Sequence, residues 1–151
     1  MKKLLLLGAL MFTIGTVNLY SEVKGARNVV KAEDNYEMGW DKVFPQSDKV
    51  THEKVTFHNR YGITLAADLY IPTNASGKLA AIAVCGPFGA VKEQSSGLYA
   101  QTLAERGYLT IAFDPSFTGE SGGSPRNVSS PDINTEDFSA AVDYLSTRSD
   151  V

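Results

Sequence analysis

The chain has 151 residues, a net charge of −3 and a single cysteine, and its length suits one domain. Its acidic balance and scattered lysines and arginines give no positive field for nucleic acid, and Cys85 alone can form neither an intrachain disulfide nor a Cys-based zinc site. No acidic cluster stands at ligand spacing around His52 and His58, so we predict no metal site and expect no cofactor.

The N-terminal residues predict a secretory signal peptide that ends near residue 20. Lys2 and Lys3 precede an apolar run over residues 4–17, which is shorter than the ~20 residues of a transmembrane helix. The alternative is a buried or anchoring helix. No cysteine follows the run to carry a lipid anchor. We therefore expect a periplasmic or secreted protein with no stable membrane span.

Residues 21–50 are polar and show little periodicity, which predicts a linker or a loosely packed arm. Trp40, Val43 and Phe44 are apolar side chains of this arm that can dock on the domain that follows. Residues 51–151 are predicted to form that domain.

The domain begins with a pattern typical of a β-hairpin. Residues 54–59 alternate polar and apolar side chains, residues 59–62 are typical of a turn, and residues 65–72 form a second strand. Residues 79–85 are continuously apolar, as expected for a parallel strand that is covered on both faces.

A helix and a further strand follow. Ser95 or Ser96 can cap the helix, Arg106 and Gly107 end it, and residues 109–113 form the next strand. The inward side chains of this helix are expected to be Leu98, Ala100, Leu103 and Ala104.

The last helix is expected to be capped by Asn134. Apolar residues then recur at i, i+3, i+4 and i+7, with Asp137 and Asp143 on the polar, solvated side. The element order is therefore β-β-β-α-β-α, which predicts the α/β class with a right-handed parallel crossover. The inward side chains of this helix are expected to be Phe138, Ala141, Val142 and Leu145.

Residues 80–94 and 109–123 each run from an apolar strand into a glycine-rich loop. Together with the helical pattern between them, they resemble the first part of an α/β-hydrolase of the dienelactone-hydrolase-like branch, and the resemblance extends over residues 50–151. It implies the N-terminal portion of that fold, an antiparallel hairpin followed by parallel βαβα in an incomplete sheet. The strand order of the family is 1-2-4-3-5, so the strand over residues 79–85 would border a missing fifth strand.

The resemblance assigns the loop over residues 86–90 to an oxyanion hole. Such a loop donates backbone N–H groups to the charge that develops on a carbonyl oxygen during acyl transfer. Pro87 has no N–H, so the donors are expected to be Phe88 first and Gly89 second. The alternative is an ordinary strand-to-helix turn.

Residues 119–123, Gly-Glu-Ser-Gly-Gly, match the G-x-S-x-G pattern of a nucleophile elbow. An elbow needs a strand directly before its serine and a helix directly after it. The strand here ends near Phe113, and residues 124–126, Ser-Pro-Arg, do not open a helix. We therefore interpret Asp114 and Ser121 as residues that shape the loop, not as catalytic groups.

The other nucleophile and base candidates are also set aside. Cys85 is interpreted as a buried structural thiol, because nothing cationic precedes it to lower its pKa. His52 lies in the polar arm and His58 in an edge strand, so a chymotrypsin-type set with Ser121 is rejected. In the resembled fold, moreover, the catalytic histidine follows the nucleophile.

The resemblance implies an exported hydrolase of esters, thioesters, lactones or amides that uses a Ser or Cys, His and Asp set. None of those three residues is identified in this chain, so we expect it to be truncated before the nucleophile and inactive alone. Its expected partners are a small acyl substrate in the full-length protein and a missing C-terminal half, with no nucleic acid. The alternatives are an exported non-catalytic binding or assembly module built on half of the fold, and a truncated, non-functional product.

Overall fold

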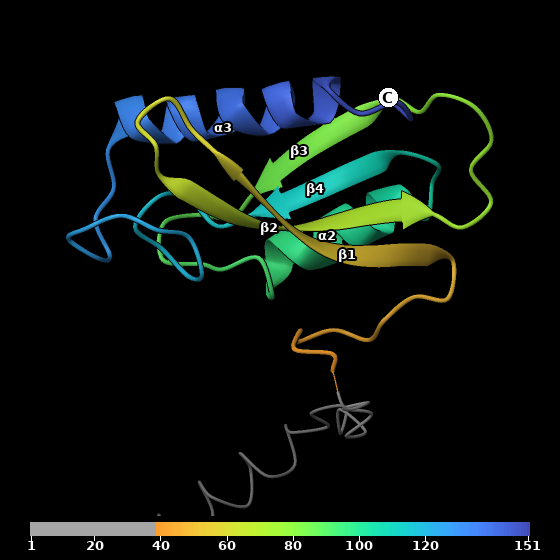
Figure 1. Ribbon diagram of the computed structural model, residues 1–151. Coiled ribbons are helices and arrows are strands. Elements are labelled where there is room, and N and C mark those ends of the chain that lie inside the picture. Colours follow the sequence, from red (N-terminus) through yellow and green to blue (C-terminus); the bar gives the residue numbers. More distant parts are fainter. Residues whose placement is uncertain (1–38) are drawn as a thin grey trace, which may run out of the picture. The chain divides into compact units, whose positions relative to one another are not determined.

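The computed structural model describes residues 39–151, of which Trp40–Val151 form one compact unit (Figure 1). The predicted signal peptide and most of the predicted polar arm lie outside the described residues. In the described part, no helix combines the length and the apolar character that a bilayer crossing requires.

A four-stranded sheet forms within this unit, in the order β1-β2-β4-β3 (Figure 1). β1 (Val50–His58) pairs antiparallel with β2 (Thr64–Pro72), and β2 pairs antiparallel with β4 (Leu109–Phe113). β4 pairs parallel with β3 (Ala81–Cys85). The predicted hairpin, the parallel pair and the order of these strands are therefore confirmed.

The turn between β1 and β2 is fixed by Asn59. Its side-chain oxygen accepts the N–H groups of Tyr61 and Ile63, both at 3.0 Å, and Gly62 takes a φ of +73°. Asparagine side chains commonly close turns in this way, and glycine adopts the left-handed conformation without steric cost. The Asn-Arg-Tyr-Gly sequence therefore determines where the hairpin reverses.

The two faces of the sheet have separate cores because strand side chains alternate between faces. On β4, Leu109 and Ile111 face one core, and Ala112 faces the other. The first core includes side chains of α3 (Pro131–Ser146), and the second includes side chains of α2 (Ser95–Ala104). The two helices therefore cover opposite faces of the sheet (Figure 1).

α2 packs closely on the sheet because its inward residues are small. Gly97 lets the helix also approach two segments outside the sheet, since a Cβ atom there would lie 2.2 Å from the backbone oxygen of Lys92 and 3.0 Å from the ring of Phe44. Ala100 and Ala104 are fully buried, as predicted, whereas Leu98 is 46% exposed. The prediction that Leu98 faces the core is therefore wrong, because glycine and alanine form the contact face.

α3 begins at Pro131, not after Asn134, and its buried face matches the predicted one only in part. Its N-cap is Ser130, and a proline in the first turn loses no helical hydrogen bond. Phe138 and Val142, predicted to face the core, are 42% and 55% exposed. The buried residues, which include two of the four predicted, are Glu136, Asp137, Ala140, Ala141 and Leu145.

β3 lies at one border of the sheet and, among the described residues, pairs with β4 alone. Every residue of β3 is half-buried, whereas every residue of β4 is buried. Parallel strands are normally covered on both faces and buried throughout. The α/β class and the incomplete sheet are therefore confirmed.

Candidate functional site

Two loops lie at the same end of the sheet, because β3 and β4 are parallel neighbours and Cys85 pairs with Phe113 at their carboxyl ends. We call residues 86–94 the first loop and residues 114–123 the second loop. In open α/β sheets, ligands bind outside the carboxyl ends of the strands. This end therefore holds the candidate site.

The side chain of Asp114 ties the two loops together. Its buried carboxylate accepts the backbone N–H of Lys92 in the first loop at 2.8 Å and that of Glu120 in the second loop at 2.9 Å. The Lys92 ammonium lies 3.2 Å from the same carboxylate. A Cβ atom at Gly119, whose φ is +53°, would lie 2.2 Å from Asp114 Oδ2, so this position requires glycine.

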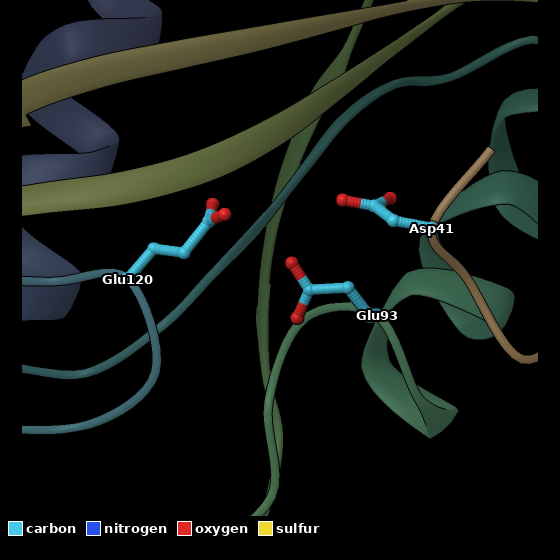
Figure 2. Close-up of side chains that lie close together, drawn as sticks. All are labelled: Asp41, Glu93 and Glu120. Atoms are coloured by element: carbon cyan, nitrogen blue, oxygen red, sulfur yellow. The ribbon is translucent and has the colours of Figure 1, made fainter. Parts of the chain in front are cut away.

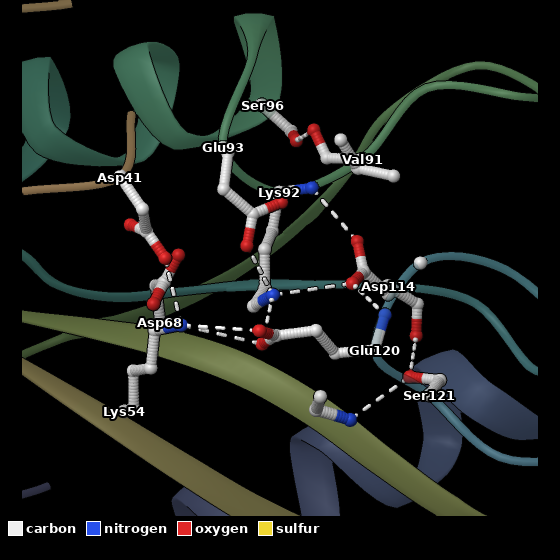
Figure 3. A network of polar contacts seen from close by, with 12 residues as sticks. Asp41, Lys54, Asp68, Val91, Lys92, Glu93, Ser96, Asp114, Glu120 and Ser121 are labelled. Atoms are coloured by element: carbon white, nitrogen blue, oxygen red, sulfur yellow. Dashed lines mark hydrogen bonds and ion pairs between the residues drawn. The ribbon is translucent and has the colours of Figure 1, made fainter. Parts of the chain in front are cut away.

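Ser121, the serine of the G-x-S-x-G pattern, is a structural residue of the second loop (Figure 3). Its Oγ donates to the backbone oxygen of Asp114 at 2.7 Å and accepts the N–H of Ala66 at 2.8 Å. Only 2% of the residue is exposed. A nucleophilic serine needs an accessible Oγ beside a base, so this geometry holds the loop against β2 instead. The prediction that Asp114 and Ser121 shape the loop is confirmed.

Lys92 is the centre of an ion-pair network that spans both loops (Figure 3). Its buried ammonium contacts the carboxylates of Glu93, Asp114 and Glu120, the last at 2.7 Å. Burial alone would lower the pKa of Lys92, but hydrogen bonds to Glu120 and Glu93 outweigh burial and hold this pKa above its usual range. Lys92 in turn holds the pKa of Glu120 below its usual range. Lys92 and Glu120 therefore stay charged at neutral pH.

Three carboxylates, those of Asp41, Glu93 and Glu120, converge near the loops (Figure 2), with oxygens within 4.8 Å of one another. Oxygen sets of this kind can bind a divalent cation. Lysine ammonium groups already neutralise this one, because Lys54 lies 2.7 Å from Asp41 and Lys92 lies 2.7 Å from Glu120. The cluster therefore belongs to the ion-pair network.

The first loop exposes its backbone. Phe88 is 70% exposed, and Gly89 has a φ of +82° with open space where a side chain would begin. Among residues 39–151, no protein group accepts a hydrogen bond from the N–H of Phe88 or Gly89, whereas the Ala90 N–H bonds to Pro87. Successive unengaged N–H groups can bind a negatively charged oxygen. The predicted donors therefore have suitable geometry, and their role stays a prediction.

A cavity of about 80 Å³ opens beside the first loop. Its wall combines the carboxyl ends of β3 and β4 with both loops and the start of α3. Pockets for drug-sized ligands usually measure about 300–1,000 Å³, so this space accommodates only a small group of atoms. Its apolar lining includes Phe88, Phe113, Pro115, Val128 and Phe138.

Cys85 stands at the wall of this cavity, with its Sγ 3.5 Å from the backbone oxygen of Gly86. Burial, and next the negative charge of Asp114, raise the pKa of the thiol to about 11. A protonated thiol is a poor nucleophile. The half-buried position and raised pKa agree with the structural role predicted for Cys85.

Both histidines lie on β1, and their side-chain hydrogen-bond partners are an aspartate and a threonine. This strand begins at Val50, earlier than predicted, so His52 belongs to the sheet and not to an arm. The Nε2 atom of His52 lies 2.8 Å from the buried Asp68, and that of His58 lies 3.1 Å from Thr64 Oγ1. The hydrogen bonds of the described residues therefore include no Ser-His or Cys-His pair.

The prediction that Asp137 is solvated is wrong. Its fully buried carboxylate accepts hydrogen bonds from the N–H and Oγ of Ser116 and from Asn59 Nδ2, each at 2.8 Å. It thereby joins α3 to the second loop and to the β1–β2 turn. Helical periodicity could not identify partners so distant in sequence, although Asp137 does stand four residues before the inward Ala141.

Comparisons with known proteins place this geometry in a family. The family model described as "X-Pro dipeptidyl-peptidase (S15 family)" matches residues 61–150. The uncharacterized protein PA2218 of Pseudomonas aeruginosa is 74% identical over 113 residues, which cover 74% of this chain and 30% of the relative. A thiohydrolase of Eupenicillium brefeldianum is 29% identical over 103 residues, which cover 68% of this chain and 32% of the relative. The chain therefore spans about a third of the length of these relatives.

Solved structures agree on the fold. The crystal structure of PA2218 superposes with a TM-score of 0.73 and 73% identity, covering 76% of this chain and 36% of that one. The α/β-hydrolase GrgF from a Penicillium species superposes with a TM-score of 0.57 and 28% identity, covering 65% of this chain and 33% of that one. The predicted N-terminal portion of an α/β-hydrolase fold is therefore confirmed, and the dienelactone-hydrolase-like branch stays a prediction.

Proposed function

This chain belongs to the X-Pro dipeptidyl-peptidase (S15) family, and from that premise we propose that it supplies the oxyanion-binding loop of a hydrolase. The reaction is the transfer of an acyl group to water from an ester, thioester, lactone or amide. Thioesters come first among these substrates, because a relative that aligns over 68% of the chain is named a thiohydrolase.

The observation that carries the proposal is the pair of unengaged N–H groups on Phe88 and Gly89, beside the cavity at the end of β3. A nucleophile that attacks an acyl carbon pushes the carbonyl electron pair onto oxygen. Donors that already point at this oxygen stabilise the charge without reorganisation. When the carbonyl re-forms, the C–O, C–S or C–N bond breaks, and the leaving group departs as an alcohol, thiol or amine that carries the proton taken from the nucleophile. Water then attacks the acyl group in the same way, which releases the acid and restores the nucleophile.

The nucleophile, its histidine and its acid are assigned to a longer polypeptide, of the length that the relatives have. Two observations support this assignment. Ser121 is buried, and its hydroxyl already donates one hydrogen bond and accepts another within the protein. The pKa of the Cys85 thiol is about 11, so this thiol is protonated at neutral pH. We accordingly expect the 151-residue chain by itself to hydrolyse activated esters no faster than its Ser121→Ala variant.

A chimera tests the function. Residues 40–151 replace the aligned part of PA2218, and hydrolysis of a panel of chromogenic esters and thioesters is measured beside PA2218 itself. The proposal predicts turnover by both proteins. An active PA2218 with a folded but inactive chimera would contradict the proposal, and so would the failure of both folded proteins on every substrate.

The N–H of Phe88 is tested in the same chimera by two substitutions. Phe88→Pro removes the N–H, and loss of one oxyanion donor typically lowers kcat by about 100- to 1,000-fold, or about 2.7–4 kcal/mol. Phe88→Ala keeps the N–H and removes the ring, so it should retain most of kcat. Equal losses in the two folded variants would assign the effect to the ring and not to the donor.

Export is proposed from the sequence alone, on Lys2, Lys3 and the apolar run over residues 4–17. Protein recovered from the periplasm or medium should have an N-terminus near residue 20. A cytoplasmic product that retains Met1 would contradict export.

A further inference from the structure

The segment Trp40–Phe44, which precedes the sheet, is docked on the domain. Trp40 and Phe44 are 9% and 6% exposed, and the indole N–H donates to the Phe44 backbone oxygen at 2.5 Å. The predicted docking of these two residues is confirmed, whereas the side chain of Val43 is exposed. The backbone N–H of Val43 donates to the oxygen of Glu93 at 3.0 Å. The segment therefore contacts the first loop directly.

Alternating charges connect this segment to both loops (Figure 3). Asp41 lies 2.7 Å from Lys54 on β1, and Lys54 lies 3.2 Å from Glu120 in the second loop. Glu120 in turn lies 2.7 Å from Lys92 in the first loop. Burial alone would raise the pKa of Asp41, but hydrogen bonds from Lys42 and Lys54 outweigh burial and hold this pKa well below its usual range. The series of pairs is therefore charged at neutral pH.

Lys42 gives Asp41 a fixed position. The buried Lys42 ammonium lies 2.6 Å from Asp41 and 3.0 Å from the fully buried Asp68, and it stands 5.0 Å from the centre of the Trp40 ring. Charge-assisted pairs of this kind have defined geometry. A carboxylate anchored beside a buried ion pair can hold Lys54 in one place, which a carboxylate on a loose arm cannot.

We propose that Asp41 is a positioning residue for the candidate oxyanion donors. It acts through Lys54 and Glu120 on Lys92, which belongs to the first loop and whose N–H is held by Asp114. Asp41 itself touches neither donor. This inference rests on the proposed function, because it concerns the same N–H groups, and it makes a segment outside the sheet part of the scaffold of the site.

Hydrogen–deuterium exchange on the 151-residue chain tests the inference without requiring turnover. In Asp41→Asn, the hydrogen-bonded amides of the first loop, those of Ala90, Lys92 and Gln94, should exchange several-fold faster, while amides of β4 stay close to wild type. Asp41→Glu keeps a carboxylate and should restore most of the protection. The matched control is Asp48→Asn, seven positions along the chain at an exposed carboxylate with no ion pair among the described residues. It should change nothing.

Lys54→Met breaks the same connection from its other side. It should speed first-loop exchange as Asp41→Asn does, and the double variant should be no faster than the faster single variant. Unchanged first-loop exchange in Asp41→Asn would overturn the inference. Equal acceleration in the first loop and β4 would also overturn it, because that result indicates a general loss of stability, and so would additive effects in the double variant.

The chimera separates this inference from the proposed function. There, Asp41→Asn should lower kcat several-fold with little change in KM, because the donors act on the transition state. Faster loop exchange with an unchanged kcat in a Phe88→Pro-sensitive chimera would overturn the inference alone, because the loop would then loosen without disturbing the donors. An active, Phe88→Pro-sensitive chimera in which Asp41→Asn changes neither exchange nor kcat would overturn the inference alone.

Discussion

The two loops at the carboxyl ends of β3 and β4 are built in opposite ways. In the second loop, Asp114 and Ser121 are buried and bonded within the protein, and Arg126 donates to the backbone oxygens of Gly119 and Ser121. The first loop exposes Phe88 and leaves successive N–H groups unengaged among the described residues. The loop that carries the catalytic-looking motif is thus the scaffold, and the other loop is open to a ligand.

This contrast has a physical origin. A G-x-S-x-G sequence gives a nucleophile only where a strand and a helix hold the serine on an exposed turn. Here seven residues separate the end of β4 at Phe113 from Ser121, and the loop folds back so that the hydroxyl reaches the backbone of β2 at Ala66. Gly119 of the same pattern leaves room for the Asp114 carboxylate, and Gly123 leaves room for the ring of Phe117.

The largest effect that distinguishes the loops should follow from Asp114→Asn. The substitution weakens the pair with the buried Lys92 ammonium and replaces one acceptor oxygen by an NH2 group that faces loop N–H groups, which together should cost about 3–5 kcal/mol of unfolding free energy. The exposed Asp143→Asn on α3 is the control and should stay within about 0.5 kcal/mol of wild type. Urea unfolding measures the free energy of unfolding of both variants. A similar loss in Asp114→Asn and Asp143→Asn would contradict the role of Asp114 in joining the two loops.

Glycine-to-alanine substitutions compare the loops at matched positions. Gly119→Ala forces a Cβ against Asp114 and strains a left-handed residue, which together should cost about 2–4 kcal/mol. Gly89→Ala carries the same kind of backbone strain in open space and should cost only about 1–2 kcal/mol. An equal loss of unfolding free energy in the two variants would show that the second loop is no more tightly packed than the first.

Ser121→Ala should destabilise the chain by about 1–3 kcal/mol, because it leaves the buried Ala66 N–H and Asp114 backbone oxygen without their shared partner. The exposed Ser146→Ala at the end of α3 is the matched control and should have an effect below about 0.5 kcal/mol. The readout is the urea midpoint. An unchanged urea midpoint in Ser121→Ala would mean that the hydroxyl does not stabilise the loop.

The smallest expected effect concerns acid. Hydrogen bonds from lysine and histidine outweigh burial in Asp68, and the pKa values of Asp41, Asp68 and Glu120 all lie below their ordinary values of 3.8 and 4.5. The folded state therefore binds fewer protons than the unfolded state. This stabilisation is present above about pH 4.5 and is lost as the pH falls below 3.8. When the pH falls from above 4.5 to below 3.8, the urea midpoint of Asp41→Asn should fall less than that of wild type. An equal fall in the two proteins would contradict the pairing of Asp41.

The sequence patterns predicted the parts of the fold that depend on local periodicity. Alternation identified the β1–β2 hairpin, continuous apolar runs identified β3 and β4, and the absence of a strand before Ser121 removed it as a nucleophile. Phe88 and Gly89 followed from the resemblance, with their conformation visible only in the structure.

The sequence patterns failed where contacts between residues far apart in the sequence determine which side chains are buried. Asp137 is buried because Asn59 and Ser116 donate to it, and Phe138 and Val142 on the same helix lie partly exposed. The Lys92 network was also missed, since its members come from the segment Trp40–Phe44, β1 and both loops, and no spacing rule relates them.

Ser121 holds the second loop and is not a nucleophile, and labelling with an organofluorophosphonate tests this role most directly. A reactive serine attacks phosphorus, fluoride leaves, and the protein gains one phosphonyl group. Mass spectrometry of the treated chain should show unmodified Ser121 in the folded protein. If Ser121 were labelled stoichiometrically in the folded protein but not in protein denatured before labelling, the second loop would not be a scaffold.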